Sequence, residues 1–319
     1  MTIGTLFKLA LGRFALVGFA LAACLSPSRA ADPVKITLGT TPLADVMPAF
    51  IAKEKGFFAK HGLDVSFTII PLNPTIPAGL ISNSIQVGAP NAAVFLQAAD
   101  NGLELQLIAG STTSPSMGAG IAYLTRADVP FDGPASLPGK KIIIPGLGSS
   151  VDVLFRKWLA DKGINEKQIS FIEVSSAQTD DALKSRAVDG AVVVEPFLTR
   201  IQQTGNGKLA VRFMDGLAGG KLGISYVATK SWIAANREAA KGFRAAIDEA
   251  IAWANANQSE ARTMLAPYIK LPQSVIDALP FPNMDNGLTD DSVQWWIDTM
   301  KAQGRITGNM KAADLIARP

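Results

Sequence analysis

Segments with the alternating pattern of β-strands are separated by helical segments along most of this chain. Val34 to Thr40 alternates apolar and polar side chains and is rich in β-branched residues, which predicts a strand. A helical stretch follows to about Lys60, Gly62 suits the end of that helix, and Leu63 to Ile70 alternates again. Strands that alternate with helices favour parallel sheets covered on both faces, so we predict an α/β fold.

The same unit recurs over the rest of the chain. The 319 residues are enough for two α/β lobes, each of which buries its own core. No repeat of fixed period and no low-complexity tract interrupts the pattern. Strands are expected at 85–88, 105–109, 120–125, 141–144, 170–174, 191–194, 210–213 and 224–229, and the main helices at 149–162, 178–186 and 231–257.

The first thirty residues have the composition of an export signal. Lys8 and Arg13 precede an apolar run over 14–23, which is too short to span a bilayer. Ser28-Arg29-Ala30 then places small residues at the −3 and −1 positions of a cleavage site after Ala30. We therefore predict a signal peptide over 1–30 and a periplasmic location.

Cys24 is the only cysteine of the chain and lies inside this leader, so the mature protein would contain no internal disulfide. Leu21-Ala22-Ala23-Cys24 also fits a bacterial lipobox, in which case a lipid anchor would be attached at Cys24. Removal of Cys24 with the leader is the interpretation we favour, because the Ser-Arg-Ala site follows so closely. Either outcome places the protein outside the cytoplasm.

The charge balance argues against classes of protein that rely on a strongly basic surface. The whole chain has 30 Lys and Arg residues against 27 Asp and Glu residues. Three of the basic residues (Lys8, Arg13 and Arg29) lie in the leader, which leaves 27 of each sign and a formal net charge of zero. We therefore expect no nucleic-acid partner and no attraction to an anionic membrane.

Small polar residues follow several predicted strands, at the junctions with the next helices. In open α/β sheets a ligand binds at the carboxyl ends of the strands, where helix N-termini converge. Five such junctions rich in Ser, Thr, Asn and Gly predict a polar ligand pocket. The candidate ligand-binding residues are Thr40, Thr41, Asn91, Thr112, Thr113, Gly148, Ser149, Ser150 and Glu195.

Three stretches resemble a family of ABC-importer binding proteins for sulfonates, taurine and nitrate, which also includes binders of thiamine pyrimidines. The stretches cover most of residues 35–230, in the order and spacing of the family. They are 52–65, with Gly56-Phe57-Phe58 and Gly62-Leu63-Asp64-Val65; 79–88 with the helix that follows; and 137–150, continued by Val188-Asp189-Gly190-Ala191 and Glu195-Pro196.

The resemblance implies a two-lobed fold of the periplasmic-binding-protein type (type II), with the ligand cleft between the lobes. Lobe I would be 31–124 plus 227–319 and lobe II 125–226, with Tyr123-Leu124-Thr125 and Ser225-Tyr226-Val227 as hinge strands. Tyr226 is thereby a further candidate for ligand contact. The implied role is to capture a small solute outside the cytoplasm, as a monomer, and to deliver it to ABC permease and ATPase subunits at the inner membrane.

Each candidate residue also has a purely structural interpretation. Ser149 and Ser150 can cap the helix that they open, or they can join its free N–H groups and its dipole in binding an anion. Asn91 can likewise be a cap, and Thr112 and Thr113 can be solvated turn residues. Glu195 can be a cap or an ion-pair partner, or it can accept hydrogen bonds from an amino or hydroxyl group of the ligand. Tyr226 can pack on a ligand or fill the core.

The residues leave the ligand open between several chemical classes. Polar junctions fit a sulfonate, nitrate or carboxylate, and we favour a small anion such as a sulfonate. None of the five junction loops contains Lys or Arg, however. This lack of cations, together with Glu195, fits a neutral or amino-bearing heterocycle such as a thiamine-pyrimidine precursor, and an aromatic acid is a further alternative.

Two other classes of function compete with the importer. The fold family includes a eukaryotic pyrimidine synthase with a lysine-bound cofactor, histidine and a cysteine-rich iron site, whereas this chain has only His61 and Cys24 to offer. The sequence contains no Gly-x-Ser-x-Gly, Walker A or His-Glu-x-x-His motif. We therefore expect no catalytic residue, no metal and no cofactor. An exported receptor for a sensor or for a tripartite carrier is the other alternative.

Overall fold

Ten strands form two five-stranded sheets in the computed structural model, which describes residues 32–113, 120–215, 217, 219–281 and 284–318. From Pro33 onward these residues belong to one compact unit. The predicted signal peptide and Cys24 lie outside the described residues. Among the helices of the described ranges, none is both long enough and apolar enough to cross a membrane.

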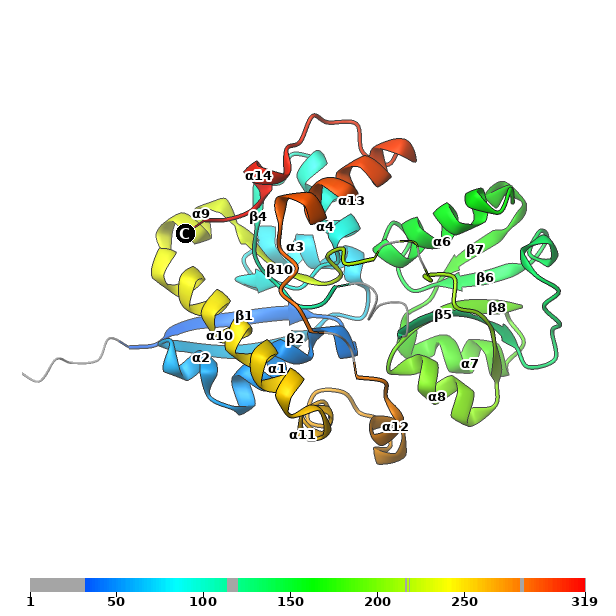
Figure 1. Cartoon of the computed structure of the whole chain (residues 1–319), viewed down its shortest axis with the longest axis horizontal. Helices are drawn as coiled ribbons and strands as arrows, with labels where there is room; N and C mark the ends of the chain where they lie inside the picture. Colours follow the sequence, from blue (N-terminus) through cyan, green and yellow to red (C-terminus); the bar gives the residue numbers. More distant parts are fainter. Residues whose placement is uncertain (1–31, 114–119, 216, 218, 282–283, 319) are drawn as a thin grey trace, which may run out of the picture. The chain divides into compact units, whose positions relative to one another are not determined.

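The first sheet has the strand order β2-β1-β3-β10-β4 (Figure 1). β1 and β2 pair in parallel along their whole length, from Val34 opposite Leu63 to Thr40 opposite Ile69. The strands predicted at 34–40 and 63–70 are therefore confirmed to within one residue. The five strands are β1 (Val34–Thr40), β2 (Leu63–Ile69), β3 (Val87–Gly88), β4 (Leu105–Gly110) and β10 (Ser225–Thr229).

The second sheet has the strand order β7-β6-β8-β5-β9. β6 pairs in parallel with β7 on one side and with β8 on the other. The last strand begins and ends a few residues before the predicted 210–213. The five strands are β5 (Ile121–Arg126), β6 (Lys141–Ile144), β7 (Ser170–Glu173), β8 (Gly190–Val194) and β9 (Gly207–Val211).

One strand of each sheet runs against its neighbours, so both sheets are mixed. The prediction of parallel sheets is confirmed for β1, β2 and β3 and for β6, β7 and β8, and it is wrong for β5 and β10. β10 pairs antiparallel with β3 and β4, and β5 pairs antiparallel with β8 and β9. Along the chain, β5 is the next strand after β4 and β10 is the next strand after β9, and in each case the preceding strand belongs to the other sheet. A strand entered in this way has no need of the crossover that makes neighbours parallel.

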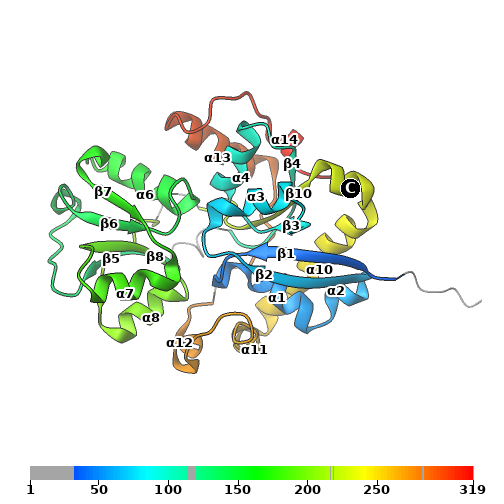
Figure 2. The same ribbon diagram turned by 180° about the vertical axis from the view of Figure 1, so that it is seen from behind.

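Helices cover both faces of each sheet, as alternating strands and helices predict (Figures 1 and 2). In the first sheet α1, α2 and α10 lie on one face and α3, α4 and α13 on the other. In the second sheet α6 lies on one face and α7 and α8 lie on the other. The helices are α1 (Met47–Glu54), α2 (Phe57–Lys60), α3 (Ile76–Ile81), α4 (Ala92–Asp100), α6 (Ser150–Asp161), α7 (Thr179–Lys184), α8 (Phe197–Thr204), α9 (Lys230–Ala235), α10 (Arg237–Ala256), α11 (Gln258–Thr263), α12 (Gln273–Ala278), α13 (Asp290–Ala302) and α14 (Ala312–Leu315).

Two of the predicted long helices are each divided into a pair. The helical stretch before His61 breaks at Gly56, whose φ of 74° is left-handed and separates α1 from α2. The stretch over 231–257 breaks at Asn236, between α9 and α10. The other main helices agree with their predicted ranges to within two residues.

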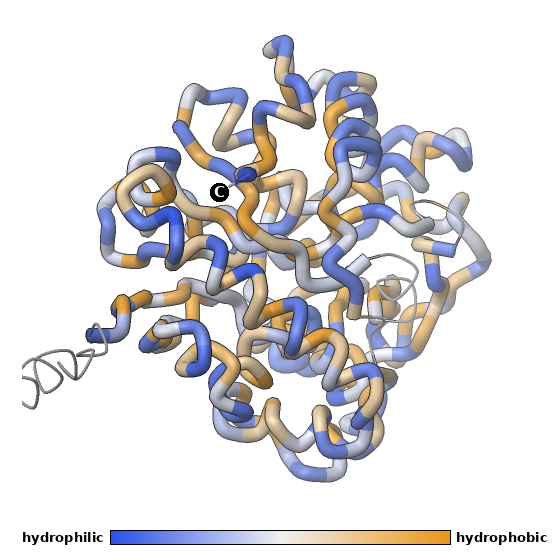
Figure 3. Tube along the Cα trace, turned by 60° about the vertical axis from the view of Figure 1, so that its left-hand side comes forward, coloured by the Kyte–Doolittle hydropathy of each residue, from blue (hydrophilic) through white to orange (hydrophobic). Residues whose placement is uncertain are grey.

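Apolar side chains fill the layers between sheets and helices. Figure 3 shows hydrophobic segments (orange) running through the interior and hydrophilic ones (blue) along turns and outer helix faces. Ile36 and Leu38 of β1 are buried beside Phe50 of α1, and Val192 and Val194 of β8 are buried in the second sheet. Burial of such side chains on both faces of the strands is the main source of stability in this architecture.

The chain passes between the sheets twice, once between Gly110 and Ile121 and once between Val211 and Ser225. The predicted lobe boundary at 124/125 falls within β5, and the one at 226/227 falls within β10. The proposed hinge strands are thus part of the two reversed strands. The division into lobes stays a prediction.

Two buried side chains of α13 hold the segment that leads into β10. The Leu222 N–H donates to Ser292 Oγ at 2.6 Å, and the Trp296 indole N–H donates to the Leu222 carbonyl at 2.7 Å. Trp296 is fully buried and Ser292 nearly so. The next residue is fixed as well, since the Gly223 N–H donates to the Thr112 carbonyl at 2.8 Å. These bonds satisfy backbone groups that the interior would otherwise leave unpaired.

Replacing Trp296 with phenylalanine is expected to lower the free energy of unfolding by about 1–3 kcal/mol, because the buried Leu222 carbonyl loses its donor. The neighbouring Trp295, which packs edge-on against Trp296 and is only partly buried, offers the matched control. Urea denaturation of W296F and W295F measures the change in the free energy of unfolding in each variant. Equal losses in the two variants would mean that ring volume, and not the hydrogen bond, carries the effect.

Candidate functional site

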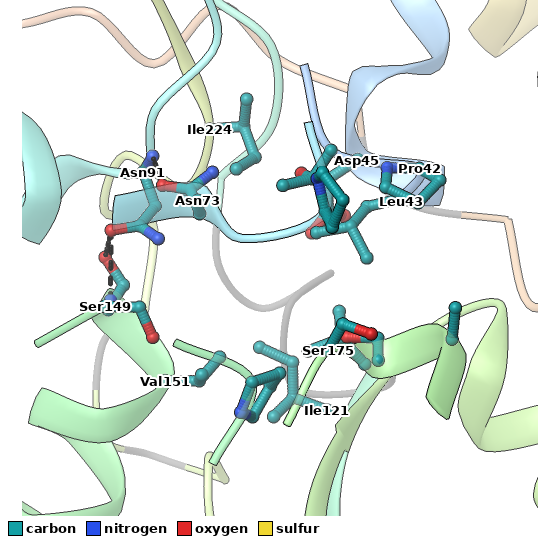
Figure 4. Close-up of a pocket in the computed structure, with 18 of the residues that line it drawn as sticks. Pro42, Leu43, Asp45, Asn73, Asn91, Ile121, Ser149, Val151, Ser175 and Ile224 are labelled. Atoms are coloured by element: carbon teal, nitrogen blue, oxygen red, sulfur yellow. Dashed lines mark hydrogen bonds between the residues drawn. The ribbon is translucent and has the colours of Figure 1, made fainter. Parts of the chain in front are cut away.

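A cavity of about 190 Å³ opens where strands of both sheets end. This is more than ten times the ~15 Å³ that a single water needs, so the space suits a small organic molecule. Figure 4 shows Asn73 and Asn91 on one side of it, Pro42, Leu43 and Asp45 on another, and Ser149, Val151 and Ser175 below. It is lined by Thr41, Pro42, Leu43, Asp45, Ile69, Pro71, Asn73, Asn91, Ile121, Pro145, Ser149, Ser150, Val151, Ser175, Ser176, Ala177, Val194, Gly223 and Ile224.

The strand-end rule explains how the predicted residues reach this place. Thr41 follows β1, Asn91 precedes α4, and Ser149 and Ser150 open α6 after β6. These four predicted residues line the cavity. The other predicted residues lie outside its lining: Thr40, Thr112, Thr113, Gly148, Glu195 and Tyr226.

Asn91 and Ser150 tie α4 to α6 at the wall of the cavity. The carboxamide oxygen of Asn91 accepts three hydrogen bonds: from the Val94 N–H at 3.1 Å, from the Ser150 N–H at 3.0 Å and from the Ser150 hydroxyl at 3.0 Å. The Ser150 hydroxyl in turn accepts from the Ala93 N–H at 3.2 Å. Asn91 is therefore the cap of α4, and both side chains have structural partners.

Ser149 and Thr41 differ from these two residues because their hydroxyl groups are unused. Ser149 occupies the N-cap position of α6 but makes no side-chain capping bond. Its Oγ and the Oγ1 of Thr41 are buried and have no hydrogen-bond partner among the residues that the structure describes. Since buried hydroxyls are normally paired, two unpaired ones in the lining of one cavity point to a ligand that supplies the partners.

Gly148 lies behind the lining, in a network that anchors the start of α6. Its N–H donates to Asp152 Oδ2 at 2.8 Å, and its carbonyl accepts from Gln97 at 3.0 Å. Asp152 is buried and forms ion pairs with Arg156 and, at 3.6 Å, with Arg305. Because the Gly148 N–H is already taken, this residue serves to position Ser149 beside the cavity.

Glu195 directs its carboxylate toward the start of α8. Its two oxygens accept from the Thr199 N–H at 3.0 Å and from the Thr199 hydroxyl at 2.9 Å. Burial raises the pKa of Glu195, the two Thr199 bonds and the charge of Arg212 oppose that rise, and the nearby Asp45 adds to it. This agrees with the structural interpretation of Glu195 as a helix-start cap.

Tyr226 and the polar loop after β4 support the wall from outside. The Tyr226 hydroxyl lies 3.2 Å from Ser111 Oγ, and burial raises the pKa of the phenol. The Thr112 carbonyl accepts a hydrogen bond from the Gly223 N–H, and Thr113 forms an isolated antiparallel β-bridge with Leu222. Thr40 is fully buried at the end of β1, and its hydroxyl donates to the Thr41 carbonyl at 3.3 Å.

Asp45 is a lining residue that the sequence patterns did not predict. It lies in the short 3-10 helix Ala44–Val46 before α1, and Ser111 Oγ donates to its backbone carbonyl at 2.6 Å. Desolvation raises the pKa of its carboxyl group to about 6. The only sequence feature that could have indicated Asp45 is its position, five residues after the end of β1. An acidic residue near the start of a helix is also explained by its favourable interaction with the helix dipole, so this position alone did not suggest a binding role.

Asn73 and Ser175 were missed for a simpler reason. They follow β2 and β7, two strands whose junctions were not among the five predicted to bind ligand, although the same rule applies to them. Asn73 is buried, accepts from the Asn91 N–H at 2.9 Å and donates to the Ala89 carbonyl at 3.3 Å. Ser175 donates to Gln178 at 2.7 Å.

Comparisons with known proteins agree with this architecture. The model of the NMT1-like family matches residues 29–270. A Brucella abortus protein (strain 2308), provisionally named a binding protein, is 25% identical over 271 residues, which is 82% of either chain. The nitrate/nitrite binding protein NrtA of Nostoc sp. (strain PCC 7120) is 27% identical over 244 residues, covering 70% of this chain and 54% of that protein.

Among solved structures, the alkanesulfonate-binding protein SsuA from Xanthomonas axonopodis pv. citri, bound to MOPS, superposes with a TM-score of 0.77. The match covers 91% of this chain and 100% of that chain at 19% identity. At this level of identity the likeness shows the fold, and the predicted α/β fold of the periplasmic-binding-protein type is thereby confirmed.

Replacing Asp45 with asparagine is expected to stabilise the ligand-free protein at neutral pH. Because the pKa of Asp45 is raised in the folded state, the folded state binds more protons than the unfolded one, and stability falls as pH rises from about 4 to about 6. Asparagine removes this loss, so the D45N variant should gain about 3 kcal/mol at pH about 7.5 and nothing near pH about 3.5.

Urea denaturation across that pH range measures the effect, with the exposed Asp132 changed to asparagine as a control. A stability difference between D45N and the native protein that does not change with pH would contradict the proposed titration.

Proposed function

Because the chain belongs to the NMT1-like family, we propose that it is the extracytoplasmic solute-binding component of an ABC importer. The observation that carries this proposal is the cavity at the strand ends of both sheets, lined by Thr41 and Asn91 from one and by Ser149 and Ser175 from the other. The names of the relatives, which describe nitrate/nitrite and alkanesulfonate binding, support the same role.

A small organic anion such as a sulfonate is the ligand class that we favour. The N-terminus of the 12-residue α6 carries the positive end of the helix dipole toward the cavity. The unpaired hydroxyls of Ser149 and Thr41 add two potential donors there. Ten of the nineteen lining residues are apolar, among them Ile121, Val151 and Ile224, which favours an organic anion over a bare inorganic ion.

A neutral or amino-bearing heterocycle, or an aromatic acid, is the second candidate. The lining contains neither Lys nor Arg among the described residues, and its one ionisable side chain, Asp45, is acidic. Anion binding here would therefore depend on hydroxyls, N–H groups and the helix dipole alone. A heterocycle would use the apolar walls and offer donors to the carboxylate.

The remaining parts of the proposal follow from the same role. The mature protein, starting near residue 31, would be periplasmic, and a lipid at Cys24 would be an alternative to removal of the leader. The lobes 31–124 plus 227–319 and 125–226 would close around the ligand by hinge bending, and the closed monomer would dock on permease and ATPase subunits. The ligand would leave chemically unchanged.

A thermal-shift screen of residues 31–319, refolded to remove carried-over ligand, tests the binding role. The panel contains alkanesulfonates, aminosulfonates, nitrate, aromatic acids, thiamine pyrimidines and amino acids. A compound that binds only the folded state stabilises it by about 2.7 kcal/mol at a hundredfold excess over Kd. A saturable shift with an unaltered compound supports the proposal, whereas chemical conversion of the compound would contradict it.

The two serines at the start of α6 are expected to differ when each is changed to alanine. S149A should weaken binding of the compound found in the screen about tenfold, and leave the stability of the ligand-free protein within about 0.5 kcal/mol, because the Ser149 hydroxyl has no partner to lose among the described residues. S150A should lower stability by about 1–3 kcal/mol, because the Ala93 N–H and Asn91 lose a partner.

Calorimetric titration and urea denaturation separate the two effects, with the remote exposed Ser185 changed to alanine as a control. Unchanged affinity in S149A would remove that hydroxyl from the binding site.

A further inference from the structure

Asp45 presents a carboxylate to the cavity without any partner of its own. No hydrogen bond or ion pair involves its carboxylate oxygens within the described part of the chain, although its backbone carbonyl is fixed by Ser111. It is also the sole ionisable side chain among the described lining residues. A charge in such surroundings is unfavourable unless a cation or a strong donor approaches it.

The charged groups around Asp45 do not fill this role. Glu195, which follows β8, is close enough to Asp45 that the negative charge of Asp45 raises the pKa of the Glu195 carboxyl group. Arg212, which follows β9, acts on Glu195 and lowers that pKa, and Thr199 occupies both Glu195 oxygens. The raised pKa of Asp45 itself has burial as its cause, and no neighbouring cation lowers it.

The cavity therefore has two chemically different ends. Ser149, with an unpaired hydroxyl at the N-terminus of α6, lies across the cavity from Asp45 in Figure 4. Side chains such as Leu43, Ile121 and Val151 line the space between them. The end at Ser149 and the α6 N-terminus suits a negatively charged group, and the end at Asp45 suits a hydrogen-bond donor. The space between them suits an apolar part of the ligand.

From this arrangement we infer that Asp45 is a specificity-determining residue, which selects organic acids or sulfonates that also carry a protonated amino group on an apolar body. The inference rests on the proposed function and narrows its ligand class. The amino group donates a charge-assisted hydrogen bond to the Asp45 carboxylate, while the acidic group meets Ser149 and the α6 N-terminus. This would explain why the described lining contains no cationic side chain, because the protonated amino group of the ligand supplies the positive charge.

The alternative role for Asp45 is that its carboxyl group stays protonated and donates a hydrogen bond to an anionic ligand. In that case asparagine, which also donates, would replace Asp45 without loss, and lower pH would strengthen the binding of plain anions. The two uses of Asp45 therefore predict opposite responses to the D45N substitution and to pH.

Isothermal titration of the refolded protein, residues 31–319, with matched pairs of compounds tests the inference. The pairs are aminopropanesulfonate and propanesulfonate, aminopentanoate and pentanoate, and aminomethylbenzoate and methylbenzoate. For at least one pair the amino compound should bind about tenfold or more tighter at pH about 7.5. D45N should abolish that preference, and the D132N control should retain it.

A second measurement at pH about 5 adds a readout that misfolding would not produce. Because the pKa of Asp45 is raised to about 6, the native protein should lose most of its preference for amino compounds at the lower pH, and D45N should show no change between the two. Circular dichroism establishes that D45N is folded.

The outcomes separate this inference from the proposed function. A plain acid that binds as tightly as its amino partner, or a preference that survives in D45N, overturns the role of Asp45 and leaves the binding role intact. A native protein that binds none of the six compounds, but does bind another member of the screening panel, overturns the ligand class alone. A native protein that binds nothing in either set overturns both.

Discussion

The carboxamide oxygen of Asn91 is the point on which the site depends. It accepts hydrogen bonds from the Val94 N–H in α4 and from the N–H and hydroxyl of Ser150 in α6. The first turns of α4 and α6 are therefore bonded to the same atom. Each of these helices follows a strand of a different sheet. The remaining lining residues acquire defined positions because this link sets the distance between the two strand ends.

Around this link the polar side chains divide into those that hold the wall and those that face the space. Asn73, Asn91, Ser150 and Thr112 have all or part of their hydrogen-bonding capacity committed to protein partners. Ser149, Thr41 and the Asp45 carboxylate have no such partner among the described residues. A binding site needs both kinds, because rigid walls allow a few unpaired groups to stay oriented for a ligand.

Much of the fold could be predicted because alternation and strand ends are visible in the sequence. The rule that ligands bind where strands end predicted Thr41, Asn91, Ser149 and Ser150, which line the cavity, and their contact with a ligand stays a prediction. Strand direction is not encoded in alternation, so the reversal of β5 and β10 was missed. Asp45 was missed because only packing around it, and no local pattern, distinguishes a cavity-facing acid from an ordinary residue near a helix start.

The pairing of β10 with β4 has a consequence for the order of folding. Gly110 and Ser225 are direct partners in the first sheet, yet the whole second sheet lies between them in the sequence. Tyr226 and Ser111, in contact beside this pair, are 115 residues apart along the chain. Closing so long a loop in an unfolded chain is entropically unfavourable, whereas a folded second sheet brings its own two ends close together. We therefore expect the inserted segment to fold before β10 joins the first sheet, and the cavity, which needs the ends of strands from both sheets, to form after that pairing.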